Sequence, residues 1–524
     1  MALEDHSDLG SSAAPDLELK LAVTPEQMRR LRHHPLVASA HPSRRSLART
    51  YFDTPDLALH RRSLDLRVGK EGHRYVQTLT GSNGKASIPP TALAWQSPVP
   101  GAAPDLSRLA HYHAVSDIDA SQLQPVFVSR IRRSTRVVHP DDATTVEVSC
   151  DEGHIETAGG LTLPVCELEL GLRAGPRQAL YELARALNEA APLRIETRSK
   201  ADRGYALLAG DEHRHPRERG FGKVELTPEL PAEEALAAIL RHALWHMLAN
   251  DQAALHGEAE GVHQMRVALR RLRATFSLFR PMIPGEQRLW ATGEMKWIAT
   301  ALGPARNWDV FAEHVEPLEQ HFPEARGIAV LSRAAQESRQ AAYGLVQQTI
   351  TAPRYTDFVL RMLTWTETRG WRQQSVSETS VHLLAPLGNL AAELLERRHR
   401  KARRLARRFG ELAAAERHEL RIAFKKLRYA ADSLQELYRA KAVKRYVRRL
   451  AVLQDDLGIV NDVATMDGLL EQLKETAGPG DGLRHGAALM QGWYGHVMAA
   501  CEARLAKKLD RFMDMRLFWR GAGS

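Results

Sequence analysis

The chain has 524 residues, a net charge of +9 and an isoelectric point near 9.5. One hydrophobic core rarely serves a chain of this length, so two or more domains are expected. Hydrophobic residues make up 44% and charged residues 26%, which is typical of a soluble globular protein. The three cysteines include no C-x-x-C pair, so neither a disulfide framework nor a thiolate zinc site is supported. The positive charge suggests an anionic partner without identifying it.

The N-terminus lacks the features of a secretory signal. Residues 1–20 read MALEDHSDLGSSAAPDLELK, with acidic residues where a signal peptide needs a basic start and an apolar run. The most apolar stretch, 234–248, is interrupted by Arg241, His242 and His246, so it is not expected to span a membrane. We therefore expect a cytoplasmic protein that makes no contact with a membrane.

The pattern of hydrophobic and polar residues changes near residue 209. Before this point, short runs alternate between apolar and polar residues with a period of two, which predicts β-strands, and helices are expected at 24–34 and 176–190. After residue 231, long segments rich in Ala, Leu, Arg and Glu follow the 3.6-residue period of helices. The expected organisation is a flexible N-terminus at 1–15, an α+β domain at 16–209, a linker at 210–230 and an all-α domain at 231–519.

Several predicted strands carry charge on one face and apolar residues on the other. An antiparallel sheet with one solvated face gives this pattern. A closed sheet with its charged faces turned inward gives it too, and would place acids to hold a divalent metal and cations to hold phosphate oxygens. The charged residues on these faces are Asp16, Glu18 and Lys20, then Arg130 and Arg132, then Glu167 and Glu169.

A series of motifs runs through residues 16–209. They are DLELK at 16–20, YFDTPDLAL at 51–59, LRVG at 66–69, VQTL at 76–79, SRIRRS at 129–134, VEVSCDEG at 146–153, CELEL at 166–170 and RSKADRGYAL at 198–207. In this order they resemble the CYTH domain, the family of triphosphate tunnel metalloenzymes, over nearly the whole domain. The resemblance implies an eight-stranded antiparallel β-tunnel with flanking helices. It also implies hydrolysis of inorganic triphosphate or related triphosphates with Mg2+ or Mn2+ as cofactor.

Carried over residue by residue, the resemblance implies two sets of tunnel residues. The possible metal ligands are Asp16, Glu18, Glu167 and Glu169. The possible phosphate contacts are Lys20, Arg67, Arg130, Arg132, Lys200 and Arg203. No catalytic residue is assigned.

The sequence departs from the family pattern both among the metal ligands and among the phosphate contacts. Asp16 shortens the first carboxylate of the opening motif, and uncharged residues replace charged ones at Gly69, Thr80, Ala92, Ala94, Gln96 and Gly171. If each lost contact removes about 2–3 kcal/mol of transition-state stabilisation, two or three losses slow hydrolysis by several decades. We expect a tunnel that binds phosphate chains with reduced or lost hydrolysis. Full activity, with a neighbouring lysine such as Lys70 as substitute, is the alternative.

The second half of the chain contains one basic helical sequence twice. HQMRVALRRLR at 263–273 returns as HELRIAFKKLR at 418–428, an offset of 418 − 263 = 155 residues. The Leu-Gly pair at 302–303 returns at 457–458 with the same offset. A spacing shared by two motifs predicts an internal duplication, with repeats at about 231–385 and 386–519 related by pseudo-twofold symmetry.

In each copy, histidine and basic residues share one helix face beside an apolar face that must be buried. The apolar faces hold Met265, Leu269 and Leu272 in the first copy and Leu420, Phe424 and Leu427 in the second. The two basic stripes are His263, Arg266, Arg270 and Arg273, and His418, Arg421, Lys425 and Arg428. A single basic stripe is usually a solvated surface. Two matched stripes beside buried faces favour a binding role.

The repeated motifs resemble the CHAD domain, a helical domain named for its conserved histidines, over residues 231–519. The resemblance implies a basic cavity or groove between two four-helix halves, with inorganic polyphosphate as ligand and no cofactor. The basic stretches 397–408 and 441–449 contain one aromatic residue, Tyr446, whereas non-specific nucleic-acid binders usually place aromatic residues among their cations. These stretches add Arg403, Arg407, Lys444 and Arg448 to the candidate polyphosphate contacts.

Together the two halves predict a cytoplasmic protein that binds inorganic polyphosphate or triphosphate, with a tunnel of reduced or lost hydrolysis. The first alternative is a working metal-dependent triphosphatase whose helical domain gathers substrate. Charge alone also allows a non-specific nucleic-acid binder. A metal pair formed by the stripe histidines is disfavoured, because neither has a second histidine at i+4 with a carboxylate. The sequence leaves open the oligomeric state and any association with polyphosphate granules.

Overall fold

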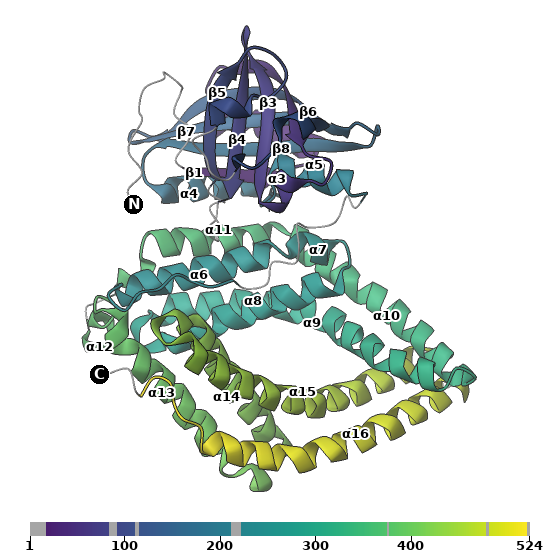
Figure 1. Ribbon diagram of the computed structural model, residues 1–524. Helices are drawn as coiled ribbons and strands as arrows, with labels where there is room; N and C mark the ends of the chain where they lie inside the picture. The colour runs from purple at the N-terminus through teal and green to yellow at the C-terminus, as the bar shows by residue number, and fades with distance from the viewer. Residues whose placement is uncertain are drawn as a thin grey trace. The chain divides into compact units, whose positions relative to one another are not determined.

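The computed structural model describes residues 17–82, 92–109, 115–210, 222–374, 377–477 and 481–520. The chain divides into two compact units, residues 1–212 and 213–524. The first, called here the sheet unit, contains an antiparallel sheet, and the second, called the helical unit, consists of helices (Figure 1). This confirms the predicted order of an antiparallel sheet followed by an all-helical region. Most of the predicted linker, residues 211–221, lies outside the described residues.

All described strands of the sheet unit belong to one antiparallel sheet. They are β1 (Leu17–Ala22), β2 (Ser43–Asp53), β3 (Leu64–Glu71), β4 (Arg74–Ser82), β5 (Ala92–Val99), β6 (Gln124–Asp141), β7 (Thr144–Thr157), β8 (Thr162–Ala174) and β9 (Arg194–Ile195). Their order across the sheet is β5-β4-β3-β2-β6-β7-β8-β1-β9. The sheet therefore has nine strands where eight were expected. The ninth, β9, is two residues long, which is too short for a period-two pattern to reveal it.

In the described part of the sheet unit, five α-helices accompany the sheet. They are α1 (Pro25–Arg32), α2 (Pro35–Ala38), α3 (Ala58–Arg61), α4 (Arg177–Ala190) and α5 (Lys200–Leu208). Helices α1 and α4 confirm the predictions at 24–34 and 176–190. Asp53, from the YFDTP motif, accepts hydrogen bonds from the backbone N–H of Leu59 at 2.9 Å and of His60 at 3.0 Å. It also accepts one from the Tyr205 hydroxyl at 3.0 Å, so this motif residue links the start of α3 to α5.

The sheet has two faces of different chemistry. Directly paired residues of antiparallel strands lie on the same face. The pairs Lys20↔Glu169, Glu167↔Asp151 and Arg133↔Asp151 therefore place these five residues on one face, called here the charged face. The alternating leucines lie on the opposite face and are buried, namely Leu17, Leu19 and Leu21 of β1 and Leu168, Leu170 and Leu172 of β8. The predicted separation of charged and apolar residues on these strands is confirmed.

The helical unit consists of long helices joined by short turns. They are α6 (Ala232–Leu248), α7 (Asp251–Leu255), α8 (Ala259–Leu278), α9 (Gly285–His321), α10 (Arg326–Thr351), α11 (Pro353–Glu367), α12 (Glu378–Val381), α13 (Leu387–Ala406), α14 (Ala414–Ser433), α15 (Ala440–Ala477) and α16 (Asp481–Met513). Among the described residues, no helix combines the length and the apolar character that crossing a membrane requires.

Helix boundaries repeat with the offset found in the sequence. Helices α6, α8, α9 and α10 begin at residues 232, 259, 285 and 326, and α13, α14, α15 and α16 begin at 387, 414, 440 and 481. Every difference equals 155, as in 414 − 259 = 155. The backbone N–H of Ala232 donates to the carbonyl of Ala385 at 3.0 Å, and that of Leu387 donates to Leu230 at 2.8 Å. The two donors are 387 − 232 = 155 residues apart and the two acceptors are 385 − 230 = 155 residues apart, so the bonds are exchanged between the repeats, which supports the predicted duplication.

The apolar faces of α8 and α14 are buried as predicted. Met265, Leu269 and Leu272 on α8 have at most 1% of their surface exposed, and Leu420, Phe424 and Leu427 on α14 have none. Helices α8 and α14 are also in contact with one another. Burial of these apolar faces fixes the rotation of both helices and so determines where their basic stripes point.

Candidate functional site

Figure 1 labels four helices of the helical unit, α8, α9, α14 and α15. Side chains of these helices line a cavity of about 890 Å3. Its wall contains ten lysine and arginine residues and one acidic residue, Asp462. The ten cations are Arg266, Arg270, Arg273, Arg280, Arg288, Lys296, Arg306, Arg421, Lys425 and Lys426. Such an excess of positive charge in a cavity attracts anions strongly.

The cavity brings the two basic stripes together. Seven of their eight members line it, namely His263, Arg266, Arg270, Arg273, His418, Arg421 and Lys425. Arg428 does not, because its side chain donates to the amide oxygen of Gln454 at 3.2 Å and lies 3.9 Å from the carboxylate of Asp432. The candidates from the flanking basic stretches, Arg403, Arg407, Lys444 and Arg448, are not in the cavity wall either.

Most cations of the cavity have no acidic partner in the described parts of the chain. Arg306 alone among them forms an ion pair there, with Glu313 at 2.9 Å. The Nε atoms of Arg266 and Arg421, which occupy equivalent positions in the two repeats, are buried and have no hydrogen-bond partner in the described residues. Arg270 donates to the hydroxyl of Tyr429 at 2.8 Å, which leaves its charge uncompensated. The cavity therefore carries positive charge that the described residues do not neutralise.

Crowding and burial disfavour the charged forms of these side chains. Burial, together with neighbouring arginines, lowers the pKa of Arg266 to about 10. Burial and the charge of Arg421 lower the pKa of Lys425 to about 7. Burial and Arg306 also lower the pKa of His263. An anion in the cavity would oppose all of these shifts, because it stabilises each protonated form.

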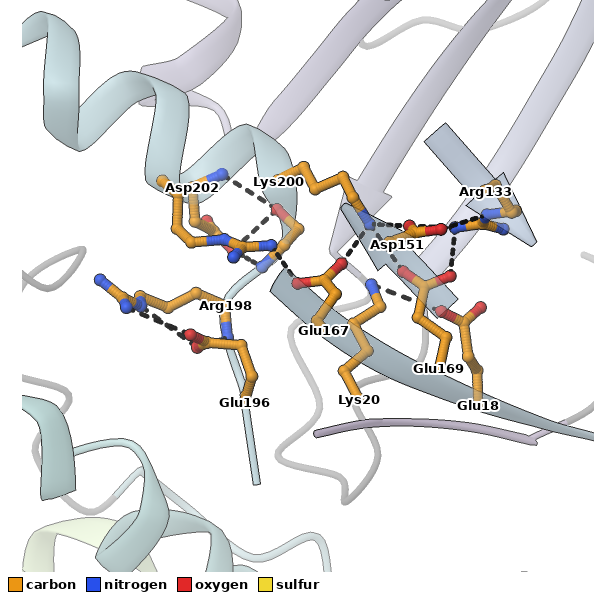
Figure 2. Close-up of polar contacts among 12 residues, drawn as sticks. Glu18, Lys20, Arg133, Asp151, Glu167, Glu169, Glu196, Arg198, Lys200 and Asp202 are labelled. Atoms are coloured by element: carbon orange, nitrogen blue, oxygen red, sulfur yellow. Dashed lines mark hydrogen bonds and ion pairs between the residues drawn. The ribbon is translucent and has the colours of Figure 1, made fainter. Parts of the chain in front are cut away.

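The sheet unit contains a second candidate site, built around three buried acids. Oxygens of Asp151, Glu167 and Glu169 all lie within 4.8 Å of one another. The Nζ of Lys200 is 2.8 Å from Asp151 and 2.8 Å from Glu169, and it also contacts Glu167. Figure 2 shows the ammonium group of Lys200, which comes from α5, among the carboxylates of β7 and β8. The three acids are called here the acidic cluster. Two further cations, Arg133 and Arg203, also contact them.

The acidic cluster is neutralised from within. Arg133 lies 2.6 Å from Asp151 and contacts Glu169, and Arg203 lies 2.5 Å from Glu167. Three cations therefore face three carboxylates. Burial opposes ionisation of Glu169, but Lys200 and Arg133 outweigh it and hold the pKa of Glu169 well below its usual range.

The three carboxylates could hold a divalent metal, since Mg2+ and Mn2+ prefer oxygen ligands. A metal bound there would supply Lewis-acid chemistry toward phosphate oxygens. It would have to replace Lys200, whose ammonium group contacts the same oxygens. Glu18, another predicted ligand, is 3.6 Å from Lys20 and is not a member of the acidic cluster. Asp16, the fourth, lies outside the described residues.

Local sequence explains how α5 brings its two cations to the acids. Ser199 caps the helix, because its hydroxyl accepts from the N–H of Asp202 at 3.0 Å and its own N–H donates to the Asp202 carboxylate at 2.8 Å. A Cβ atom on Gly204 would lie 2.2 Å from the ring of Phe127 on β6. Glycine at this position therefore lets α5 approach the sheet closely enough for Lys200 to reach the acidic cluster.

The structure separates the predicted phosphate contacts of the sheet unit. Lys20 and Arg67 lie on the charged face. The expectation that Arg130 and Arg132 share it is wrong: both are exposed on the opposite face, because Arg133 is the residue that pairs with Asp151. Three consecutive polar positions in RIRRS allow either register, so alternation alone chose the wrong arginines.

Two residues missed in the sequence belong to this face. Asp151 completes the acidic cluster, and Arg49 on β2 lies near Arg67 and Arg133. Burial, together with the charge of Arg67, lowers the pKa of Arg49. The period-two pattern of residues 146–153 could have placed Asp151 on the charged face. Ser149, Asp151 and Gly153 share one face of the strand and alternate with residues of the other face.

The departures from the family pattern are on the same charged face. Register pairs place Gly69 opposite Arg49, Thr80 opposite Asp65 and Ala94, and Gln96 opposite Thr78. Lys70, the suggested substitute, is one residue from Gly69 and therefore lies on the other face of the strand. The side chain of Ala92 lies outside the described residues.

Two family models match the chain in succession. The CYTH domain model matches residues 14–205, and the CHAD domain model matches residues 238–471. The chain carries a CYTH domain followed by a CHAD domain. The charged face and the acidic cluster lie in the CYTH domain, and α8, α9 and α14, which supply most of the cavity wall, lie within the matched part of the CHAD domain. Both resemblances found in the sequence are confirmed.

One curated relative is the inorganic triphosphatase of Haemophilus influenzae, with 28% identity over 207 residues. The match covers 37% of this chain and 54% of the relative, so the chain spans about half the length of that protein. It involves the CYTH domain, and the triphosphatase activity is that of the relative.

Several solved structures are similar to parts of this chain. The CHAD domain of the plant Ricinus communis has 27% identity and covers 57% of this chain and 97% of its own, with a TM-score of 0.49. PptA from Streptomyces chartreusis has 15% identity and covers 54% and 100%, with a TM-score of 0.41. HpAC1 from Hippeastrum, a putative adenylyl cyclase with a dominant triphosphatase activity, has 16% identity and covers 37% and 95%, with a TM-score of 0.27. At these TM-scores the likenesses carry no argument about function.

Proposed function

We propose that the helical unit binds inorganic polyphosphate in its cavity, and that the sheet unit binds phosphate chains with reduced or lost hydrolysis. The observation that carries the first part is the cavity wall, with ten lysines and arginines against one carboxylate. Planar guanidinium groups match pairs of phosphate oxygens, and polyphosphate offers about one negative charge per phosphate. A polyphosphate chain therefore supplies the charge that the cavity lacks.

The extent of the cavity favours a chain over a single phosphate. Its lining residues on α8 run from His263 to Ser277, a separation of 14 residues. At a rise of 1.5 Å per residue this is about 21 Å along the helix. In this proposal the repeats at 231–385 and 386–519 each contribute one basic stripe, so one chain is held from both sides.

The sheet unit supports phosphate binding by a different arrangement. Its CYTH domain is similar to an inorganic triphosphatase, and Lys20, Arg49 and Arg67 lie on its charged face beside the acidic cluster. The uncharged residues Thr80 and Ala94 on the same face support slow hydrolysis, because they offer no charge to the transition state. A working triphosphatase is the second candidate, and the acidic cluster that could hold a metal favours it.

Calorimetric titration of the full-length protein with long-chain polyphosphate tests the first part. We expect tight binding that RNA and heparin displace poorly, because the cavity wall is mostly cationic and a polyphosphate chain offers a charge at every phosphate with no base or sugar ring to accommodate. Equal competition by RNA would favour the nucleic-acid alternative. No binding of polyphosphate at all would contradict the proposed function of the helical unit.

Phosphate release from triphosphate with Mg2+ or Mn2+ tests the second part. We expect little release, and tighter triphosphate binding in Thr80→Lys, because the new ammonium group would point from the charged face. Robust turnover by the unmodified protein with either metal would support the triphosphatase alternative instead. The assay measures hydrolysis and the titration measures binding, so each can fail without the other.

A further inference from the structure

One end of the cavity is in contact with α13, a helix that does not line it. Arg273, Ser277 and Arg280 form this end of the wall near the last turn of α8, together with Lys426 of α14. The guanidinium of Arg398 on α13 donates to the Ser277 hydroxyl at 3.0 Å. A cation outside the cavity is therefore bonded directly to its wall.

Arg398 has a cationic neighbour on the same helix. Lys401 is three residues further along α13, so the two side chains share one helix face. Arg398 is half-buried and Lys401 is exposed, and neither forms an ion pair with a described residue. Helix α13 packs against α14, which carries Lys426.

Electrostatics connect these two residues to the cavity. Burial lowers the pKa of Lys426, and the charges of Arg398 and Lys401 add to this effect. Arg273 and Arg280 of the cavity wall also contribute to it. Cations inside the cavity and on α13 are therefore close enough to repel one another, and one polyanion passing between them would relieve both groups.

We infer that Arg398 and Lys401 form an exit segment, a second binding site for the part of a polyphosphate chain that leaves the cavity beside Ser277. This inference rests on the proposed function of the helical unit. A chain that ends inside the cavity does not reach the exit segment, whereas a long chain contacts both. The exit segment therefore makes the protein prefer long polyphosphate over short chains.

The test compares the unmodified full-length protein with the double variant Arg398→Ala, Lys401→Ala. Titrations use triphosphate and long-chain polyphosphate at two salt concentrations. We expect unchanged triphosphate affinity and about tenfold weaker long-chain binding. The slope of log affinity against log salt should fall by roughly 0.7–0.9 for each lost contact, by analogy with nucleic acids. Binding of triphosphate by the sheet unit does not blur this result, because both changes lie in the helical unit.

A matched control removes two exposed cations of α16, Lys507→Ala and Arg511→Ala, which do not line the cavity. The single variant Lys401→Ala provides a change that leaves the Arg398 contact with Ser277 intact, in case the double variant is poorly folded by circular dichroism. If the unmodified protein binds no polyphosphate, the proposed function fails. If it binds long chains and the exit-segment variants bind them no more weakly than the control does, the exit segment is refuted.

Discussion

The two units contain similar cations in opposite situations. In the sheet unit, Lys200, Arg133 and Arg203 face three buried carboxylates and are neutralised by them. In the cavity of the helical unit, Arg266, Arg421 and every other lysine and arginine except Arg306 form no ion pair with a described residue. A basic residue at a candidate phosphate site can therefore play one of two roles, depending on whether the protein already neutralises its charge. Where it is paired, a ligand must compete with the protein, and where it is unpaired, a ligand completes the site.

The same comparison has an energetic side. Removing one member of a buried ion cluster leaves an uncompensated charge, which costs about 3–5 kcal/mol. Removing a cation from a crowded cavity instead reduces repulsion in the free protein, so the stability of the fold is kept while ligand binding is lost. The signs of these two effects separate a structural cation from a binding cation, and they can be measured.

The largest expected effect is on the acidic cluster. Lys200→Ala should destabilise the sheet unit by about 3–5 kcal/mol, because it leaves Asp151, Glu167 and Glu169 with too little positive charge. Hydrogen exchange at the amides of β7 and β8 measures this loss within the full-length protein. Added Mg2+ or Mn2+ should restore part of the protection, since the freed oxygens suit a divalent cation.

Arg130→Ala is the control for this change. Arg130 is exposed on the opposite face, 3.7 Å from Glu156, and its removal should alter stability by at most about 1 kcal/mol. Equal exchange rates in Lys200→Ala and the unmodified protein would show that the Lys200 contacts do not hold the acidic cluster together.

The next effect is on polyphosphate binding. The triple variant Arg266→Ala, Arg270→Ala, Arg273→Ala should bind long-chain polyphosphate at least about a hundredfold more weakly, since each hydrogen bond to a charged group contributes about 1.5–3 kcal/mol. The second-stripe variant Arg421→Ala, Lys425→Ala should also lose affinity strongly. Both should fold normally, because the buried apolar faces of α8 and α14 are unchanged. Calorimetry measures binding, and circular dichroism measures folding.

A control with the same change of charge is available on α16 and beyond it. Lys507, Arg511 and Arg516 are exposed and lie outside the cavity wall, so their triple replacement by alanine should change affinity little. Equal losses in the control and the cavity variant would mean that net charge governs binding. Unchanged affinity in a folded cavity variant would reduce the basic stripes to solvated helix faces.

How far the sequence could predict these sites depends on the strength of its periodicity. The buried faces of α8 and α14 follow an unambiguous 3.6-residue pattern, and this fixed the direction of both basic stripes. In β6, by contrast, Arg130, Arg132 and Arg133 leave two possible registers, and only the pairing of Arg133 with Asp151 decides between them. Strand register depends on partners distant in sequence, which no local pattern contains.

Four further cavity cations could not be predicted, for a related reason. Arg280, Arg288, Lys296 and Arg306 come from the 3-10 helix Arg280–Met282 and from α9, and no repeat marks them. They join the site because α9 packs along α8, a contact that the duplication suggests but does not place. Arg403 and Lys444 show the converse case. A dense run of basic residues predicts that they bind polyphosphate, and they lie outside the cavity wall, so their role stays a prediction.

A smaller effect concerns pH. In the free protein Lys425 has a pKa near 7, and a bound polyanion raises it, so binding above this value takes up a proton. Affinity should therefore fall as the pH rises above about 7, by at most about tenfold per unit for this one group. Below that value Lys425 is already charged and contributes no pH dependence. Calorimetry in two buffers of different ionisation enthalpy measures the proton uptake directly.

Lys425→Arg sharpens this test because arginine stays charged throughout the range. It should bind at least as tightly as the unmodified protein and lose the proton uptake above the pKa of Lys425. His263 should add a weaker dependence at lower pH, since burial and Arg306 lower its pKa and the polyanion opposes this. Equal proton uptake in Lys425→Arg and the unmodified protein would assign the titration to another group.

The smallest effect concerns the cavity's single acid. Asp462 raises the pKa values of Arg421 and Lys425, and it would repel a polyanion. Asp462→Asn should strengthen polyphosphate binding by up to about fivefold, which corresponds to at most about 1 kcal/mol. The gain should be larger one pH unit below the pKa of Lys425 than one unit above it. Without Asp462 the pKa of Lys425 falls further, so at the higher pH the protonation of Lys425 that accompanies binding costs more free energy.

Asp455→Asn, an exposed change on the same helix, is the control. Weaker binding of Asp462→Asn at both pH values would mean that Asp462 positions the cations, and that the cavity is partly paired in the manner of the acidic cluster.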